Sequence, residues 1–431
     1  MNYKETVDYL YSMLPMFTRI GAAAIKKDLT NTIAICNALN NPQQHYKTIH
    51  IAGTNGKGST SHMLAAILQQ AGYKTGLYTS PHLIDFRERI RVNGKPVSEV
   101  DVVLFVERNK TLIEQIKPSF FECTVAMAFW YFSIQEVDIA VVETGLGGRL
   151  DSTNVVKPEL SIITNIGFDH MDLLGDTLDK IAFEKAGIIK KNTPVVVGEY
   201  LSITEPVFTE KASKENAKIV FVQDEVKIND FCLTNNGCSI SVQTQQNKYD
   251  NVTCDLGGLY QKQNIATVIK SVEELNGLRF KITKQDLFNG LAQTKKLTGL
   301  LGRWQILSNH PLTITDVGHN VDGISFIVKQ LELYNFNKLH MVFGMVKDKD
   351  ITKVLALLPK HAIFYFTKAN LPRALNEKDL KQLALQFNLQ GIAFETVKDA
   401  IKEAKKNASE NDLIFIGGST FVVAEALPYY M

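Results

Sequence analysis

Cysteine is scarce in this sequence, and the few cysteines form no metal-binding or redox pattern. Among 431 residues there are five cysteines, none of them in a C-x-x-C pair or in a cysteine–histidine cluster with zinc spacing. A sparse, odd set in a long chain is typical of reduced thiols in a reducing compartment. The pattern argues against a disulfide-stapled fold and against a zinc site, and burial is a more common role for such thiols than catalysis.

Long hydrophobic runs and an excess of one charge are also absent. No segment approaches the ~20 apolar residues that a membrane span needs, and residues 1–5 (MNYKE) contain no apolar signal core. Lys and Arg number 47 against 45 Asp and Glu, a formal net charge of +2, so the chain lacks the broad basic field of a nucleic-acid-binding protein. We therefore expect a cytoplasmic protein without membrane or nucleic-acid partners, and a monomer as the default state.

The composition is that of a globular protein with more than one hydrophobic core. Hydrophobic residues make up 45% of the chain and charged residues 21%, and this length suggests two or three domains. In the first part, short apolar strands alternate with amphipathic helices, an order that favours a parallel sheet. The expected strands are residues 47–52, 137–143, 160–165 and 194–197, and the expected helices are residues 59–71 and 177–188.

The middle and the end of the chain predict two further sheets. Residues 221–253 are polar, β-branched and rich in turns, so we expect antiparallel strands there, flanking the main sheet. A second α/β module should begin near Gly302, with strands at residues 312–315, 339–343, 362–366 and 412–416. The segment 294–302 contains Gly299 and Gly302 and is the expected hinge between two domains, residues 1–296 and 297–431.

The strongest single motif is a glycine-rich loop, GTNGKGS at residues 53–59. It follows an apolar strand and opens an amphipathic helix, the setting in which backbone N–H groups and a helix N-terminus bind phosphate. Lys57 would neutralise the β- and γ-phosphates, and Ser59 or Thr60 would reach Mg²⁺. The spacing is shorter than the usual G-x-x-x-x-G-K-[ST]. A glycine-rich turn that binds nothing is the weaker interpretation, because strand, lysine and helix start occur together.

A GTPase is one alternative for a protein with such a loop. Residues 247–250 match N-K-x-D and residues 255–258 match D-x-x-G. Their order along the chain is the reverse of that in a GTPase, and neither follows an apolar strand. We interpret both as chance matches.

Two other expected strands end in polar side chains that would lie near the loop. Glu143 ends VDIAVVE and His170 follows LSIITNIGFD. Because ligands gather at the carboxyl ends of strands in open α/β sheets, both residues could hold a divalent cation there. A carboxylate suits Mg²⁺, whereas an imidazole suits softer metals, and a salt bridge for Glu143 or a structural role for His170 stays open. Lys185, judged from the residues alone, is a solvated lysine near a helix end at Gly187.

Taken together, the motifs resemble the Mur ligase superfamily, and within it the dihydrofolate synthase/folylpolyglutamate synthase branch. The resemblance covers essentially the whole chain, and SPHL and GLGGRLDSTN are more typical of this branch than of cell-wall ligases. It departs from the family pattern at residues 316–320, DVGHN in place of D-G-A-H-N, and matches weakly over residues 17–32. The motifs are IHIAGTNGKGST (49–60), TSPHL (79–83), FFE (120–122), ETGLGGRLDSTN (143–154), TNIGFDHMDLLG (164–175), FEKAGIIK (183–190), GLLGRWQ (299–305), TDVGHN (315–320) and GMVKDKD (344–350).

The resemblance implies a fold and a role for individual residues. The fold would be a P-loop domain with a mainly parallel sheet plus a smaller antiparallel sheet, followed by a Rossmann-like C-terminal domain. The residues matching the ATP-binding positions are Thr54, Asn55, Gly56, Lys57, Gly58 and Ser59 for the triphosphate, Asn264 for adenine, Arg303 for phosphate and Asp316 for ribose. The residues matching the Mg²⁺ positions are Ser59, Ser80, Glu143 and His170.

The resemblance also implies catalytic and substrate residues. Lys185 matches a lysine that the family carbamylates, which replaces its interpretation as a solvated lysine, and the resulting anion would help to hold a second Mg²⁺. Lys57 and His319 would complete the catalytic set, with His319 near the reaction centre. On the substrate side, Phe121, Leu150, Asp151 and Ser152 resemble the wall around the pterin ring, and the expected substrate residues also include Glu122 and Arg149.

The implied reaction is ATP-dependent formation of an acyl phosphate on dihydropteroate or a reduced folate, followed by attack of L-glutamate. ATP would bind in the cleft between the domains, and domain closure would bring in Arg303. One alternative is a cell-wall Mur ligase, which would need a nucleotide-sugar domain ahead of the loop, where only about 50 residues precede Gly53. A second alternative is a nucleotide-dependent switch. It does not explain why Glu143, His170 and Lys185 occur together.

Overall fold

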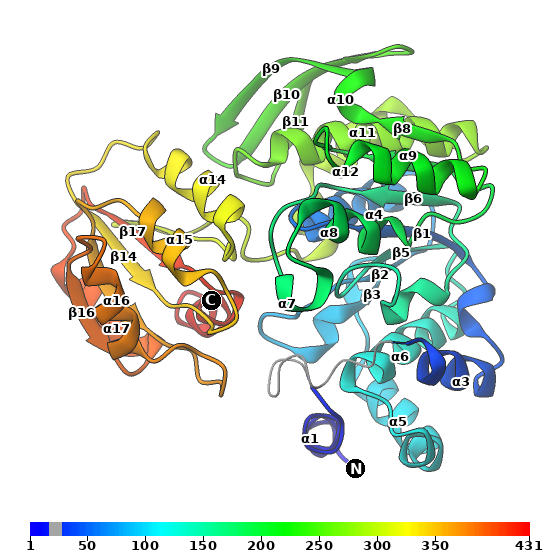
Figure 1. The fold of residues 1–431 in the computed structure, drawn as a ribbon, viewed down its shortest axis with the longest axis horizontal. Helices are drawn as coiled ribbons and strands as arrows, with labels where there is room; N and C mark the ends of the chain where they lie inside the picture. The colour runs from blue at the N-terminus through cyan, green and yellow to red at the C-terminus, as the bar shows by residue number, and fades with distance from the viewer. Residues whose placement is uncertain (17–27) are drawn as a thin grey trace. The chain divides into compact units, whose positions relative to one another are not determined.

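The computed structural model describes residues 1–16 and 28–431, which fold into two compact units (Figure 1). The first unit comprises Met1–Gly167, Met171–Asp255 and Tyr260–Leu300, and the second comprises Phe168–His170, Leu256–Leu259 and Leu301–Met431. The weakly matching segment 17–32 lies largely outside the described residues. No helix in the described part of the chain is long and apolar enough to cross a membrane.

The first unit is built on an eight-stranded sheet in the order β4-β3-β2-β5-β1-β6-β7-β8. From β2 to β8 the neighbouring strands run parallel, and β3 and β4 add an antiparallel edge. The central strands are almost wholly buried, as expected of hydrophobic runs in a parallel sheet. The strands are β1 Lys47–Ala52, β2 Thr75–Tyr78, β3 Ile90–Val92, β4 Lys95–Pro96, β5 Ile139–Glu143, β6 Leu160–Ile163, β7 Val195–Val197 and β8 Ile219–Phe221.

The helices of the first unit place the glycine-rich loop and its neighbours. Helix α4, which follows the glycine-rich loop, packs against α11, α12 and α13, and Ser119 caps α6 through a reciprocal bond with Glu122. The helices are α1 Tyr3–Met13, α3 Thr30–Ala38, α4 Lys57–Gln70, α5 Glu99–Ile116, α6 Phe120–Ile134, α7 Met171–Leu174, α8 Leu178–Ala186, α9 Glu205–Lys214, α10 Val222–Glu225, α11 Gln261–Gly277, α12 Lys284–Ala292 and α13 Thr294–Thr298.

The expected strands of this unit are confirmed, with small differences at their ends. β1 has the expected bounds, and β5, β6 and β7 are shorter than expected by one or two residues. Helix α4 begins at Lys57 rather than Ser59, because Gly56 adopts a left-handed conformation (φ +84°) from which the helix can start at once. The sequence did not predict β2, β3, β4 or β8, which are too short to show a period.

The antiparallel strands expected within residues 221–253 form a sheet of their own, in the order β11-β10-β9 (Figure 1). They are β9 Val226–Thr234, β10 Gly237–Thr244 and β11 Lys248–Cys254, and they pack on α11 and α12. Thr244, Asn247 and Tyr249 all donate to Oε1 of the buried Glu273 on α11, at 2.7, 3.0 and 3.1 Å. Asn247 therefore joins the hairpin to α11. The first residue of the N-K-x-D match thus has a structural role that needs no guanine nucleotide.

The second unit carries a six-stranded sheet in the order β12-β13-β17-β14-β15-β16, antiparallel only at β12. All four expected strands are present, and β12 and β16 are additional. Within the expected hinge at residues 294–302, Thr294–Thr298 form α13, and one boundary between the two units lies between Leu300 and Leu301. The elements are β12 Gln305–Asn309, β13 Leu312–Thr315, β14 Leu339–Phe343, β15 Ile363–Thr367, β16 Gly391–Phe394, β17 Leu413–Gly417, α14 Val321–Leu331, α15 Ile351–Leu357, α16 Glu377–Leu385, α17 Val397–Asn407 and α18 Thr420–Ala426.

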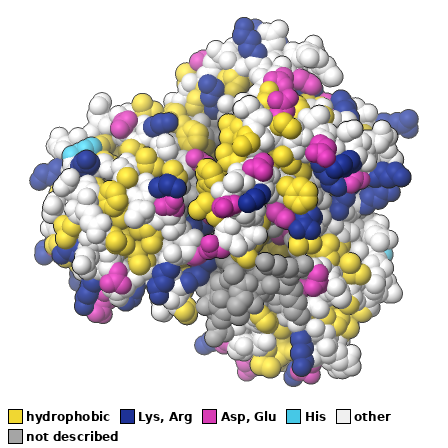
Figure 2. Space-filling model, viewed as in Figure 1, with side chains coloured by type: hydrophobic (Ala, Val, Ile, Leu, Met, Phe, Trp, Pro, Cys, Tyr) yellow, Lys and Arg dark blue, Asp and Glu magenta, His cyan; other side chains and the backbone are white. Residues whose placement is uncertain are grey.

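Charges of both signs are interspersed on the molecular face shown in Figure 2, with hydrophobic side chains between them. This distribution agrees with the balanced composition of the chain, 47 basic against 45 acidic residues.

Candidate functional site

The glycine-rich loop joins β1 to α4 and is held against the segment that follows β6. The backbone N–H groups of Thr54 and Asn55 donate to the carbonyl and the side-chain oxygen of Asn165, at 3.0 and 2.8 Å. A Cβ on Gly53, which has a φ of +150°, would lie 1.8 Å from Oγ1 of Thr164. Glycine is therefore required where the loop crosses the end of β6, and the crossing fixes the shape of the loop.

Two lysines meet at the first residue of this loop. Lys57 donates to the carbonyl oxygens of Gly53 and Thr54, at 3.0 and 3.2 Å. Lys185, on α8, donates to the same Gly53 oxygen at 2.9 Å and is only 4% exposed. Its burial follows from the spacing of α8, where positions 181, 182, 185 and 186 form the buried face. The structure thus excludes a solvated Lys185 and places it at the glycine-rich loop.

The start of α11 lies against the same loop. Gln261 donates to the hydroxyl of Ser59 at 3.2 Å and accepts from the amide of Asn264 at 2.9 Å. The amide oxygen of Asn264 would lie 2.3 Å from a Cβ on Gly56. Asn264 and Ser59 are therefore neighbours of the loop, and Gln261, which the sequence did not predict, connects them.

Glu143 and Ser80 meet at the carboxyl ends of β5 and β2. The backbone N–H of Ser80 donates to Oε2 of Glu143 at 3.3 Å, and Glu143 is 4% exposed. Across residues 1–16 and 28–431, no group of three or more His, Cys, Asp or Glu side chains could hold a metal ion. A cation at Glu143 would therefore need hydroxyl, water or phosphate oxygens as further ligands, which suits Mg²⁺. His170 belongs to the second unit.

The residues expected to form the substrate wall lie on α6 and on the loop after β5. The ring of Phe121 lies 6.2 Å from that of Tyr78 and closely covers Gly145. Glu122 is buried and accepts from Ser119 N at 2.6 Å and from Asn31 at 3.2 Å. Its carboxylate therefore caps α6.

The carboxylate of Asp151 accepts several hydrogen bonds from the loop that follows β5. One carboxylate oxygen accepts from the backbone and the hydroxyl of Thr153, and the other accepts from Leu146 N at 2.7 Å. Burial raises its pKa despite these bonds. The Thr153 hydroxyl also contacts Nε2 of His50 at 2.8 Å, and burial lowers the pKa of His50 to about 3. Leu150 is half-buried and Ser152 is buried beside Asp151.

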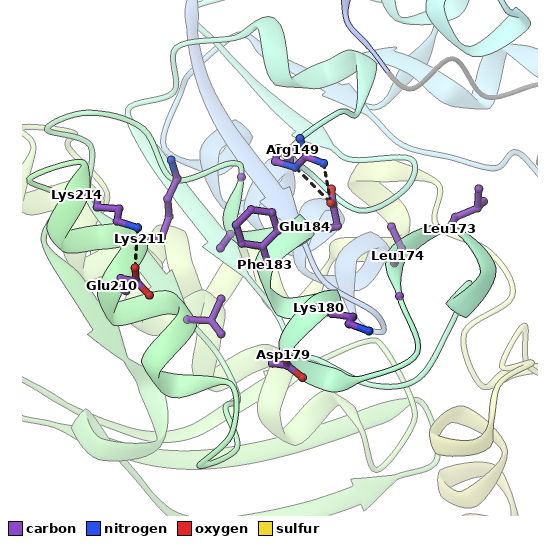
Figure 3. A pocket seen from close by; sticks show the side chains of 14 residues that line it. Arg149, Leu173, Leu174, Asp179, Lys180, Phe183, Glu184, Glu210, Lys211 and Lys214 are labelled. Carbon is purple, nitrogen blue, oxygen red and sulfur yellow. Dashed lines mark hydrogen bonds and ion pairs between the residues drawn. The ribbon is translucent and has the colours of Figure 1, made fainter.

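Arg149 points towards Glu184 on α8 (Figure 3). Its guanidinium pairs with Glu184 at 2.8 Å and lies over the ring of Phe183, 5.6 Å from its centroid. These side chains line a pocket of about 590 Å³ between α8 and α9, which Lys180, Lys211 and Lys214 also border. The backbone of Arg149 binds the end of α8 through a bond to the Glu184 carbonyl of 2.7 Å. Arg149 therefore joins the loop to the helix that carries Lys185.

In the second unit, the expected ribose ligand Asp316 directly follows β13 and is buried. Its two carboxylate oxygens accept from the backbone of Trp304 and of Gly318, both at 2.8 Å. Arg303 makes a longer contact of 3.4 Å to the carbonyl of Gly302. The carboxylate thereby fixes the strand pair β12–β13 next to Arg303.

His319 and His170 converge on a residue that the sequence did not predict, Asp169. The carboxylate of Asp169 pairs with Lys349, lies 3.6 Å from Nε2 of His319, and accepts from Asn320 at 3.4 Å. His170 Nε2 lies 3.4 Å from the Lys349 ammonium. Asp169 and Lys349 lie within two of the motifs that resemble the family, FDH and GMVKDKD. Their presence in these motifs could have marked them as site residues.

Comparison with known proteins identifies the family of the chain. The Mur ligase middle domain matches residues 51–272 and the Mur ligase glutamate ligase domain matches residues 302–420. The dihydrofolate synthase/folylpolyglutamate synthase of Bacillus subtilis (strain 168) is 32% identical over 438 residues, which cover 98% of each chain. E. coli FolC in complex with DHPP and ADP has a TM-score of 0.86 at 28% identity, over 100% of this chain and 97% of that one.

A bifunctional folylpolyglutamate synthase/dihydrofolate synthase with Mn, AMPPNP and L-glutamate bound has a TM-score of 0.85 at 27% identity, over 100% of this chain and 98% of that one. The chain belongs to the Mur ligase family, whose middle and glutamate ligase domains it carries in that order. Within this family it groups with the dihydrofolate synthase/folylpolyglutamate synthases, which are ATP-dependent ligases. The expected fold class is confirmed.

Proposed function

We propose that this protein joins L-glutamate to dihydropteroate, to the glutamyl tail of reduced folates, or to both, while ATP is converted to ADP and phosphate. The observation that carries the proposal is the phosphate loop closed at Gly53 by Lys57 and Lys185. A phosphate loop alone supports only nucleotide binding. The second lysine and the buried Glu143 support phosphoryl transfer at the same edge of the sheet, and the names of the relatives suggest the substrates.

The proposed chemistry has two steps. A carboxylate oxygen of the folate substrate attacks the γ-phosphorus, and the bond to ADP breaks, giving an acyl phosphate. The amine of L-glutamate then attacks the acyl carbon, loses a proton, and expels phosphate from the tetrahedral intermediate. No protein nucleophile is required, so positioning and charge neutralisation carry the catalysis. Lys57 and Arg303 would offset charge on the transferring phosphoryl group.

Mg²⁺ is the proposed divalent cation, held by Ser59, Ser80, Glu143 and His170. The buried Glu143 carboxylate and the Ser59 hydroxyl are oxygen donors of the kind that Mg²⁺ prefers. When bound, the ion would neutralise phosphate charge. We further propose a second ion and a carbamate on Lys185. A carbamate keeps one N–H, so Lys185 could still donate to Gly53 while its new carboxylate serves as a ligand.

The remaining residues receive the roles that the family resemblance implies. Asn264 would contact adenine, Asp316 ribose, and His319 the reaction centre. Phe121, Leu150 and Ser152 would face the pterin, whereas Glu122, Asp151 and Arg149 would hold that wall in shape, since their polar atoms bind the loop and its helices. The proposed domains are residues 1–296 and 297–431, and the proposed active form is a monomer.

The experiment is ADP release measured with dihydropteroate and with tetrahydrofolate side by side, each with and without L-glutamate. The proposal predicts glutamate-dependent release with at least one acceptor and a product heavier by one glutamyl residue. Release without glutamate, or none with either acceptor, would contradict it. Size-exclusion chromatography with light scattering would determine the oligomeric state in the same preparation.

A further inference from the structure

Asp169 is the common partner of several polar side chains in the second unit. It follows the end of β6, and its side chain is 11% exposed. One carboxylate oxygen pairs with the Lys349 ammonium, and the other faces both His319 Nε2 at 3.6 Å and Asn320 Nδ2 at 3.4 Å. The partners come from separate segments, the loop after β13 and the loop after β14, and Asp169 joins them.

Two partners of Asp169, His319 and Asn320, are each held at a second point. His319 Nδ1 lies 2.9 Å from the carbonyl of Val317, which can only accept, and this bond turns Nε2 towards Asp169. The Asn320 side-chain oxygen caps α14 through Gly323 N at 2.9 Å, which leaves its NH₂ group to donate to Asp169. The ring and the amide therefore have one orientation each.

Lys349 is the partner whose buried charge depends most on Asp169. Its side chain is 6% exposed, and a buried ammonium is costly without a carboxylate partner. Asp169 is thus the anion around which Lys349 and His319 are arranged.

We infer that Asp169 is a positioning residue of the ligase reaction, which fixes the Lys349 ammonium and the His319 imidazole relative to each other. The inference rests on the proposed function. A buried ion pair is often no more stabilising than apolar side chains of the same volume, so its presence favours a role beyond stability. Its place, at loops that follow β13 and β14, is the carboxyl edge where α/β sheets bind ligands.

The test compares Asp169→Asn and Asp169→Glu with wild type in the glutamate-dependent assay. Asp176→Asn is the matched control, since Asp176 also pairs with a lysine, Lys180, but is 78% exposed. Because a misplacement of ~1 Å can cost about 100-fold in rate, kcat of Asp169→Asn should fall about 100-fold, with the KM for ATP changed less than about threefold. Asp169→Glu should recover part of the turnover, and Asp176→Asn should resemble wild type.

A second variant separates positioning from folding. Asp169→Asn leaves the Lys349 ammonium buried without its partner, so the thermal midpoint should drop. In Asp169→Asn/Lys349→Met the unpaired charge is removed, and stability should return while kcat stays as low as in Asp169→Asn. If kcat returns with stability, Asp169 is only structural and the inference is wrong. It is equally wrong if the defect disappears at high Mg²⁺, because the neighbouring His170 would then account for it.

The outcome for wild type distinguishes this inference from the proposed function. If wild type shows no glutamate-dependent ADP release, the proposed function is wrong. Active wild type together with a folded Asp169→Asn variant of near-normal kcat would overturn only the role of Asp169.

Discussion

Lys57 and Lys185 donate to one atom, the carbonyl oxygen of Gly53, at 3.0 and 2.9 Å. Two ammonium groups that share an acceptor repel each other, and the repulsion is stronger where burial lowers the effective dielectric constant. A triphosphate bound at the loop would relieve this repulsion, and so would conversion of one lysine to a carbamate. The arrangement therefore agrees with the anionic ligand and the carbamate that we propose at this loop.

The first prediction concerns Lys57. Replacing Lys57 with Ala removes the charge that offsets the γ-phosphate, so kcat/KM for ATP should fall at least 100-fold, on the order of the effect of losing one transition-state donor. Lys57→Arg keeps the charge in a larger, planar group and should retain part of the activity. Steady-state ADP release and circular dichroism would measure both. Near-normal turnover of a folded Lys57→Ala variant would refute the loop assignment.

The second prediction concerns the carbamate. Intact-mass spectra recorded under bicarbonate should show wild-type protein heavier by one CO₂, and Lys185→Ala should lack this increase and lose most of its turnover. Lys180→Ala, on the exposed face of the same helix, should keep both the mass increase and the activity. A fully active wild type without the mass increase would contradict the proposed modification.

The third prediction concerns Gly53. A Cβ there would meet Oγ1 of Thr164 at 1.8 Å, so Gly53→Ala must displace the loop or β6. We expect a loss of about 1–3 kcal/mol in the free energy of unfolding, and loss of ATP binding because the loop changes shape. Gly277→Ala is the control, because a Cβ there meets nothing within 4 Å, and it should be neutral or slightly stabilising. Chemical denaturation and ATP titration would measure the two effects. Equal stabilities of the Gly53→Ala and Gly277→Ala variants would contradict the prediction.

The fourth prediction concerns pH and Asp255. Its Oδ2 accepts from Lys295 N at 2.8 Å, but Oδ1 has no hydrogen-bond partner among the described residues, and burial raises its pKa to about 6 from 3.8. Because the folded state holds this proton more tightly than the unfolded state, the free energy of unfolding should fall as pH rises between these values and then level off.

Asp255→Asn removes this pH-dependent penalty. It should stabilise the protein by about 1 kcal/mol near pH 8, after allowance for solvent screening of a partly exposed group, and by nothing near pH 4. Urea unfolding at both pH values would measure the difference. An equal gain at both would show that the effect is not electrostatic.

The sequence predicted β1, the glycine-rich turn after it and the helix that follows, because all three depend on local chemistry. An apolar run followed by glycines and a lysine leads to a buried strand, a tight turn and a helix start within a dozen or so residues, and β1 has the predicted bounds. The helix expected at residues 177–188 is likewise present, as α8 Leu178–Ala186. Lys185 was nevertheless misjudged from the residues alone, because its acceptor, the Gly53 carbonyl, lies far away in the sequence.

Other parts of the site could not be predicted, because they depend on how distant segments meet. Asp169 and Lys349 stand in polar loops with no period, and only the fold brings them together. The orientation of Arg149 towards Glu184 and the saturation of Asp151 by loop donors depend on the path of one loop against α8. Short strands such as β3 and β4 likewise form because a neighbour is present, since their own sequences carry little preference.

The central claim is that ATP activates a carboxylate as an acyl phosphate, and one isotope measurement tests it most directly. The folate acceptor is prepared with isotopically heavy oxygen in its reacting carboxylate, and the released phosphate is analysed by mass spectrometry. The account predicts that one heavy oxygen appears in each phosphate released, because that oxygen bridges carbon and phosphorus before glutamate displaces it. Phosphate without the label, alongside normal product formation, would contradict the account.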